Sequence, residues 1–146
     1  MKILMVCLGN ICRSPLAEGI MRHLVDQQSL NWEISSAGTG DWHIGSPPDR
    51  RSVAIAKNFG YDISAQRARH FTAQAFNDAD HILVMDKNNF KDVLKLAKSE
   101  EQRKKVKLFL ANDAEVTDPY FDNKLFEPVF QEIEARCKEL IEEFKR

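Results

Sequence analysis

The most informative stretch of the sequence is KILMVCLGNICRSP, residues 2–15. Residues 2–8 form an almost continuous apolar run, which suits a strand buried on both faces of a parallel sheet. A short loop follows. Ser14 and Pro15 are then typical of a helix start, because serine caps helices and proline is tolerated in the first turn. The apolar spacing beyond them predicts a helix over residues 14–28.

The remainder of the chain alternates strands with helices. The apolar patterns predict strands over residues 32–36, 82–85 and 106–110, and helices over residues 49–59, 87–98 and 124–145. Because no hairpin signal interrupts this alternation, we expect an α/β fold: a doubly wound, four-stranded parallel sheet of order 2-1-3-4 with helices on both faces. Right-handed crossovers bring the loops after the four strands to one sheet edge, where a ligand should bind. A single domain should span residues 1–146.

The bulk properties exclude several classes of function. The net charge is −1, so no overall field attracts nucleic acid or an anionic membrane. The apolar N-terminal run ends at Gly9, too early to span a bilayer, and no signal-peptide cleavage site follows. Three cysteines give neither a disulfide framework nor the spacing of a metal site, and they fit a reducing compartment. We therefore expect a cytoplasmic protein with no membrane insertion, nucleic-acid partner or metal.

The loop after the first strand carries the pattern Cys-x5-Arg-Ser, from Cys7 to Ser14. Backbone N–H groups in a tight turn that feeds a helix converge on one point and can hold a phosphate. Gly9 permits a turn that a side chain would obstruct, and Asn10 tolerates left-handed backbone angles. Arg13 can bind two phosphate oxygens at once, and the same positive surroundings stabilise Cys7 as a thiolate nucleophile. The predicted phosphate-binding residues are Leu8, Gly9, Asn10, Ile11, Cys12 and Arg13.

This pattern is specific. Chance alone would produce it in about one chain in a hundred of this composition. The structural alternative is a buried cysteine in a strand–helix turn, followed by a surface arginine. The loop does not match nucleotide-binding motifs, because no Lys-Ser or Lys-Thr follows it and no Gly-x-Gly-x-x-Gly is present. Ser14 could donate its hydroxyl to the Cys7 thiolate and ease its later departure.

A phosphoester also needs a proton for its leaving group. Asp118 and Pro119 follow the fourth strand, at the sheet edge where the cysteine loop opens. Pro119 restricts Asp118 to extended geometry, which suits a fixed acid. Asp113 and Asp122 share the same loop and are the competing acids. We predict Asp118 as the general acid.

Together these motifs resemble the low-molecular-weight protein tyrosine phosphatases over essentially the whole chain. The matching segments are the phosphate loop at residues 6–15, Ala68-Arg69, Phe71-Thr72, Met85-Asp86 and the acid motif Asp118-Pro119-Tyr120. The resemblance implies a two-step hydrolysis of phosphotyrosine that needs no cofactor. The Cys7 thiolate attacks phosphorus while Asp118 protonates the tyrosine oxygen, and Arg13 holds the phosphate oxygens. Asp118 then acts as base toward the water that hydrolyses the cysteinyl-phosphate.

The resemblance also assigns residues that keep the phosphate loop in shape. These loop-support residues are Asn10, Ser14, Ser36 and Gln66. Gln66 departs from the family, which commonly has a histidine there, so we expect a modest change in loop support. His70 is either its replacement or a surface residue. Asp86 either supports the site or caps a helix.

Aromatic residues on the flanking loops determine the expected substrate. By resemblance, the walls of the substrate slot are Trp42, Tyr120 and Phe121, although incidental packing is the other interpretation. A deep slot favours phosphotyrosine over the shorter phosphoserine. Related phosphoarginine phosphatases carry threonine where Ile11 stands, so Ile11 favours tyrosine and protein arginine phosphatase is the alternative function.

The expected partners are phosphotyrosine-containing proteins, a tyrosine kinase among them, and the expected state is a monomer or weak homodimer.

The other two cysteines suggest further interpretations. Mild peroxide could join Cys12 to Cys7 in a reversible disulfide, although Cys12 is equally suited to be a small loop side chain. Cys137 falls on the apolar stripe of the last helix and belongs in the core. A thioredoxin-coupled arsenate reductase would need relay cysteines, and none lies between Cys12 and Cys137. A non-catalytic phosphotyrosine-binding module is disfavoured because Cys7, Arg13 and Asp118 are all present.

Overall fold

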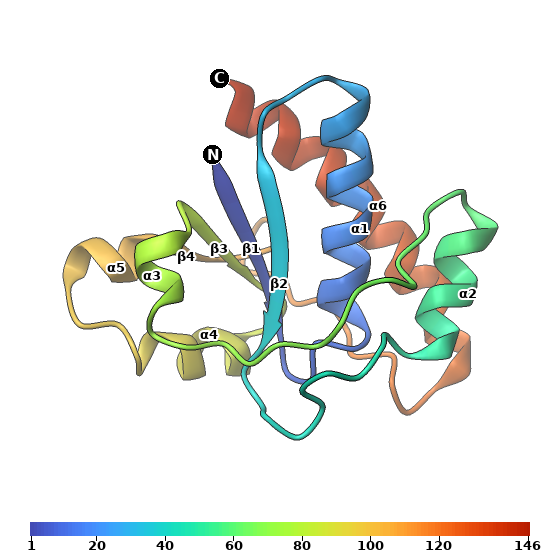
Figure 1. Ribbon diagram of the computed structural model, residues 1–146, viewed down its shortest axis with the longest axis horizontal. Coiled ribbons are helices and arrows are strands. Elements are labelled where there is room, and N and C mark those ends of the chain that lie inside the picture. Colours follow the sequence, from blue (N-terminus) through green and yellow to red (C-terminus); the bar gives the residue numbers. More distant parts are fainter.

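The N-terminal strand β1, Lys2–Cys7, lies inside the sheet and pairs with a neighbour on each side. Its neighbours are β2, Glu33–Gly38, and β3, His81–Val84, while β4, Val106–Leu108, forms the edge beyond β3. All three pairings are parallel, and the order is β2-β1-β3-β4. The predicted sheet is confirmed by the computed structural model, which describes residues 1–146 (Figure 1).

Helices cover both faces of this sheet (Figure 1). One face carries α1 (Arg13–Gln27), α2 (Arg50–Asn58) and α6 (Phe126–Lys145), and the 3-10 helix η1 (Asn123–Leu125) leads into α6. The other face carries α3 (Ala75–Asp78), α4 (Lys87–Leu94) and α5 (Glu100–Lys104).

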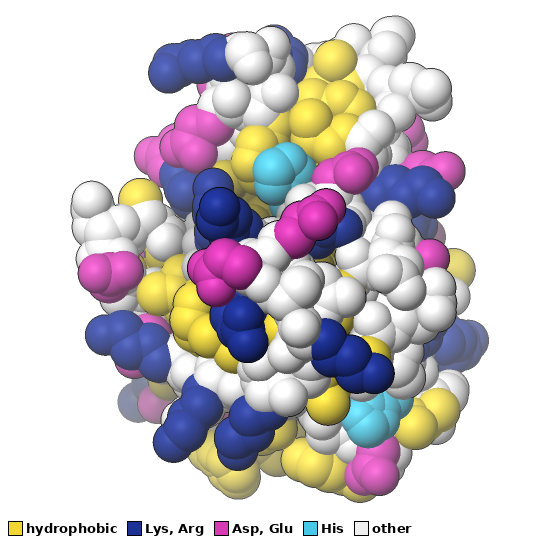
Figure 2. All heavy atoms as spheres, turned by 90° about the vertical axis from the view of Figure 1, so that its left-hand side faces the viewer, with side chains coloured by type: hydrophobic (Ala, Val, Ile, Leu, Met, Phe, Trp, Pro, Cys, Tyr) yellow, Lys and Arg dark blue, Asp and Glu magenta, His cyan; other side chains and the backbone are white.

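The helices on the second face differ most from expectation. The sequence did not indicate α3 or α5, and α4 ends at Leu94 rather than at residue 98. Helices of four or five residues are too short for apolar periodicity to appear. In addition, α5 has no buried residue. It belongs to a face on which Lys and Arg side chains are interspersed with Asp and Glu (Figure 2).

The alternating side chains of β1 divide the core into two layers. Ile3 and Met5 pack with α1 and α6, whereas Leu4 and Val6 pack with the residues of α3 and α4. All four side chains are almost completely buried. Because β1 is apolar toward both layers, its position in the middle of the sheet follows from its composition.

Because the strands are parallel, their carboxyl ends lie together along one edge of the sheet, as expected. The loop after β1, the long loop after β2 and the loop after β4 all reach this edge, and the N-terminus lies at the other end of the sheet (Figure 1). None of the helices combines the length and apolar character needed to cross a membrane.

Candidate active site

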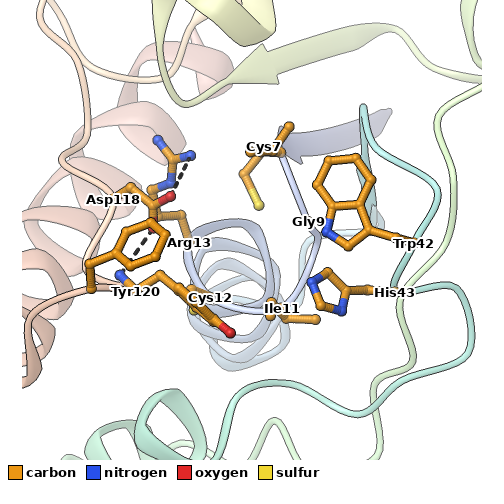
Figure 3. A pocket seen from close by; sticks show the side chains of 11 residues that line it. Cys7, Gly9, Ile11, Cys12, Arg13, Trp42, His43, Asp118 and Tyr120 are labelled. Carbon is orange, nitrogen blue, oxygen red and sulfur yellow. Dashed lines mark hydrogen bonds and ion pairs between the residues drawn. The ribbon is translucent and has the colours of Figure 1, made fainter.

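A cavity of about 350 Å³ opens at this edge between the three loops. Its lining residues are Cys7, Leu8, Gly9, Ile11, Cys12, Arg13, Trp42, His43, Asp118, Tyr120 and Phe121. All of them except His43 were predicted as site residues from the sequence. Figure 3 shows Cys7 between two groups of lining side chains, with Arg13 and Asp118 on one side and Trp42 and His43 on the other.

The phosphate loop presents unused backbone donors. None of the N–H groups of residues 8–14 donates a hydrogen bond to another backbone group. Asn10 has a φ of 56°, so it supplies the left-handed turn that the sequence suggested it could tolerate. A loop of this kind, ending at a helix N-terminus, is suited to an anion with several oxygens.

Two glycines keep space around this loop. A Cβ on Gly9 would lie 3.1 Å from the His43 ring, so Gly9 leaves room for that side chain at the cavity wall. A Cβ on Gly38 would lie 2.8 Å from the Leu8 carbonyl oxygen. Gly38 therefore allows the end of β2 to pack directly against the backbone of the phosphate loop.

A buried hydrogen-bond network fixes the turn. Asn10 Nδ2 donates to Ser14 Oγ at 2.8 Å and to Ser36 Oγ at 2.9 Å. Asn10 Oδ1 accepts from the backbone N–H of Arg69 at 2.9 Å, which fixes the orientation of the amide. Ser36 Oγ in turn donates to Glu18 Oε1 at 2.6 Å. The structure thus joins three of the predicted loop-support residues, and it adds Glu18, which the sequence reasoning had not placed in this network.

Gln66, the fourth predicted support residue, contacts the end of the phosphate-loop segment and not the turn itself. Its Nε2 donates to the carbonyl oxygen of Pro15 in the first turn of α1, and its Oε1 is buried without a partner. His70 is not a replacement, because its side chain is exposed and its backbone bridges to Gly38 at the end of β2.

Ser14 also contacts the cysteine. Cys7 Sγ and Ser14 Oγ are 3.0 Å apart, and both residues are buried. Since Asn10 donates to Ser14, the Ser14 hydroxyl proton is available for the sulfur. This geometry would stabilise a thiolate through a hydrogen bond to its charge.

Arg13 lines one side of the cavity, and only 3% of its side chain is exposed. Its NH1 donates to Asp86 Oδ2 at 2.8 Å and to the carbonyl oxygen of Val116 at 3.0 Å. Burial opposes the charged guanidinium, but the negative charge at Cys7 and the hydrogen bond to Asp86 outweigh it, so the pKa of Arg13 is raised. Asp86 has both of the roles left open by the sequence, since its Oδ1 caps α4 by accepting from the N–H of Asn89.

Asp118 is the one acid of its loop that lines the cavity. Its Oδ2 lies 3.8 Å from Arg13 NH2, and its side chain is 39% exposed. Its Oδ1 accepts from the backbone N–H of Tyr120 at 3.1 Å. The two competing acids lie elsewhere: Asp122 accepts from the N–H of Lys124 at the start of η1, and Asp113 lines a separate hollow beside α4 and β4.

The walls of the cavity are aromatic. Trp42 and Tyr120 stand on opposite sides of it, and His43 lies beside Trp42 (Figure 3). Phe121 lies at the mouth, 91% exposed, with its ring edge-on to Tyr120. The sequence reasoning missed His43, although its position next to Trp42 in the same loop was the available signal.

Cys12 and Cys137 occupy different environments. Cys12 lines the cavity together with Cys7. Burial, reinforced by the negative charge of Asp49, raises the pKa of the Cys12 thiol to about 12. Cys137 is fully buried in the core against α1, as predicted, with its Sγ 3.8 Å from the carbonyl oxygen of Ala17. No group of three or more His, Cys, Asp or Glu side chains is arranged to hold a metal ion.

Known proteins share both the sequence and the fold. The sequence model of the family described as low molecular weight phosphotyrosine protein phosphatase matches residues 2–146. The human low molecular weight phosphotyrosine protein phosphatase is 38% identical, over 96% of this chain and 93% of its own. The crystal structure of a protein tyrosine phosphatase from Entamoeba histolytica superposes with a TM-score of 0.92 at 33% identity, covering 99% of this chain and 97% of the other. Wzb of Vibrio vulnificus, solved with benzylphosphonate, gives a TM-score of 0.88 at 29% identity, covering 97% of each chain.

Proposed function

The chain belongs to the low molecular weight phosphotyrosine protein phosphatase family, and from this we propose that it hydrolyses phosphotyrosine in proteins through a cysteinyl-phosphate intermediate. One observation carries the proposal: the Cys7 thiol, the Arg13 guanidinium and the Asp118 carboxyl line a single cavity. The N–H groups of residues 8–14, which follow Cys7 directly in the chain, make no backbone hydrogen bond and are available to an anion. A nucleophile, an anion cradle and a proton donor are the three parts that phosphoester cleavage requires.

In the first step, the Cys7 thiolate attacks phosphorus and the bond between phosphorus and the tyrosine oxygen breaks. Asp118 gives its proton to that oxygen, so the product leaves as neutral tyrosine. Arg13 and the loop N–H groups hold the non-bridging oxygens as charge shifts during the transfer. The proximity of Arg13 and Asp118, 3.8 Å apart, brings the phosphate clamp and the acid to the same end of the substrate.

In the second step, the Asp118 carboxylate accepts a proton from a water molecule as the water oxygen attacks phosphorus. The sulfur–phosphorus bond breaks, and the electron pair returns to Cys7 as a thiolate. Ser14 Oγ, 3.0 Å from the sulfur, donates a hydrogen bond to the charge that forms. Inorganic phosphate is released, and Asp118 is protonated again for the next cycle.

The cavity favours an aryl phosphate. Trp42 and Tyr120 provide apolar walls on opposite sides, so a phenyl ring can fill the space between the rim and Cys7. The related Wzb was solved with benzylphosphonate, a ligand that carries a phenyl ring on a phosphonate group. Ile11 lines the same cavity and adds apolar surface where phosphoarginine phosphatases would have threonine.

The test is hydrolysis of p-nitrophenyl phosphate by wild type, Cys7→Ser and Asp118→Ala, followed by competition between phosphotyrosine and phosphoarginine. We expect no turnover in the serine variant and preference for phosphotyrosine. The alanine variant should lose about a hundredfold or more on phosphotyrosine and much less on p-nitrophenyl phosphate, whose leaving group needs little protonation. Full activity without Cys7 would overturn the mechanism. Binding of phosphotyrosine without turnover in the wild type would identify a binding module, and preference for phosphoarginine would change the substrate.

We also propose that peroxide converts Cys7 and Cys12 to a reversible disulfide. Cys12 is a neutral thiol because burial raises its pKa to about 12, so peroxide should oxidise the Cys7 thiolate first, giving a sulfenic acid and hydroxide. The Cys12 sulfur then attacks the Cys7 sulfur, and the sulfenic oxygen leaves as water. The bond protects Cys7 from irreversible oxidation.

Recovery after peroxide treatment distinguishes this role of Cys12 from a packing role. Wild type should regain activity with dithiothreitol, whereas Cys12→Ser should lose most of it permanently. Equal recovery in the two proteins would exclude the protective disulfide.

A further inference from the structure

The segment that carries Asp118 has few attachments to the rest of the molecule. We refer to residues 117–124 as the acid loop. Its backbone hydrogen bonds are local, such as those from Asp122 N to the Pro119 carbonyl oxygen and from Leu125 N to the Asp122 carbonyl oxygen. Apart from the ion pair of Asp118 with Arg13, a single hydrogen bond links it to a residue outside the loop and the helix that follows: Arg51 NH1 donates to Asn123 Oδ1 at 2.7 Å.

Arg51 contacts the acid loop a second time through its flat face. The guanidinium carbon lies 5.3 Å from the centre of the Tyr120 ring and 4.4 Å from the centre of the Phe126 ring. Both distances are within the range of cation–π attraction. One side chain therefore contacts the loop next to Asp118 and also its junction with α6.

Asp49 fixes Arg51 in this position. Arg51 Nε and NH2 donate to the two oxygens of Asp49 at 2.9 and 2.8 Å, and the Asp49 carboxylate also accepts from the Arg51 backbone N–H. This fork-to-carboxylate geometry orients a guanidinium more strictly than a single hydrogen bond does. The backbone N–H of Asp49 donates to the Ile11 carbonyl oxygen at 2.8 Å. A continuous chain of contacts thus runs from the phosphate loop through Asp49 and Arg51 to the acid loop.

We propose that Arg51 is a positioning residue, which holds the acid loop in register with the phosphate loop so that Asp118 can protonate the leaving group. The inference rests on the proposed function, in which Asp118 is the general acid. It assigns Arg51 no contact with the substrate, since Arg51 does not line the cavity. Small displacements of an acid reduce its contribution steeply, because proton transfer depends on distance and direction.

The role of Arg51 has a distinctive kinetic consequence. Leaving groups differ in their need for a proton: the tyrosine phenolate is a poor leaving group, with a conjugate-acid pKa of about 10, whereas p-nitrophenolate departs readily without help. A residue that positions the acid should therefore affect phosphotyrosine much more than p-nitrophenyl phosphate. A residue that only stabilises the fold should affect both substrates alike.

The experiment measures kcat/KM on both substrates for wild type, Arg51→Ala, Arg51→Lys, Asp118→Asn and the control Arg50→Ala. Arg50 is exposed on the same turn of α2, so its substitution controls for the loss of a positive charge. Thermal unfolding midpoints and the inhibition constant of inorganic phosphate are measured in parallel. Phosphate inhibition reports on the phosphate loop independently of the acid.

For Arg51→Ala we expect kcat/KM to fall about tenfold on phosphotyrosine and less than about twofold on p-nitrophenyl phosphate, with phosphate inhibition within about twofold of wild type. The kcat/KM of Arg51→Lys on phosphotyrosine should lie between those of wild type and Arg51→Ala, because lysine keeps the charge but lacks the planar fork. Arg50→Ala should match wild type on both substrates.

Equal losses on the two substrates, or none, would overturn the inference. If Asp118→Asn shows the leaving-group dependence and Arg51→Ala does not, the proposed function stands and the role of Arg51 is wrong. If Asp118→Asn also lacks that dependence, the assignment of the acid is wrong and the inference falls with it.

Discussion

The hydroxyl of Ser14 connects the loop scaffold to the nucleophile. Asn10 donates to its oxygen, which leaves the hydroxyl proton for Cys7 Sγ at 3.0 Å. We predict that Ser14→Ala lowers kcat about ten- to a hundredfold, the loss expected when one hydrogen bond to a charged group is removed. Steady-state kinetics on p-nitrophenyl phosphate would measure it. Unchanged kcat would show that the thiolate needs no donor at this position.

The difference between the two cavity cysteines provides a second prediction at the residue scale. Because burial raises the pKa of Cys12 to about 12, Cys12 is protonated throughout the neutral range. Burial also raises the pKa of Cys137. Iodoacetamide at neutral pH should therefore modify Cys7 before either of them, and inorganic phosphate should slow that reaction. Peptide mass spectrometry gives the order, and early labelling of Cys12 would contradict it.

Residue roles could be predicted from the sequence where one chemical requirement dictates the residue. The left-handed angle at Asn10 and the donors at Ser14 and Arg13 are requirements of this kind. The partner of Gln66, the Pro15 carbonyl oxygen, could not be predicted, because the partner of a long side chain depends on the packing of distant segments. The role of Arg51 could not be predicted from the sequence, because only the tertiary fold brings its partners Asn123 and Phe126 next to it.

Helix α2 begins at a residue with two structural roles. Asp49 is its N-cap and also the anchor of Arg51. The hydrogen bonds from Arg51 outweigh partial burial and lower the pKa of Asp49, so its carboxylate stabilises the folded protein when ionised. This contribution is complete above the unfolded-state pKa of about 3.9 and is lost as the pH falls through the lower folded-state value.

We therefore predict that Asp49→Ala is less stable than wild type at neutral pH, by about 1 kcal/mol for the cap alone, and that the difference narrows below about pH 4. Urea unfolding across this pH range would measure it. Asp26→Ala, on the exposed surface of α1, serves as the control and should show little difference at any pH. If the difference in unfolding free energy between wild type and Asp49→Ala grew as the pH fell, the stabilising role of the ionised Asp49 carboxylate would be contradicted.

Elements were predictable in proportion to their length and apolar pattern. The strands and the helices α1, α2 and α6 were identified within a few residues, because each has a continuous or periodic apolar face. The short helices α3 and α5 lack such a face. Their capping residues are polar and cannot be distinguished in the sequence from the residues of the surrounding loops.

At the scale of the whole molecule, topology assembles the site. The phosphate loop, Trp42 and Asp118 lie far apart in sequence, and parallel strands of order β2-β1-β3-β4 bring their loops to one edge. This convergence was predictable, because right-handed crossovers leave few arrangements for alternating strands and helices. What could not be predicted was the detail of loop-to-loop contact, such as His43 beside Gly9, since it depends on side-chain packing between segments without regular structure.

In the proposed mechanism, the phosphoryl group is bound covalently to Cys7 before water releases it. The most direct test is rapid acid quenching of wild-type protein during turnover of an aryl phosphate, followed by peptide mass spectrometry. We expect one phosphoryl group on the peptide that contains Cys7, located on that sulfur and absent from Cys7→Ser. Turnover with no protein-bound phosphate, or phosphate located on Cys12, would contradict this mechanism.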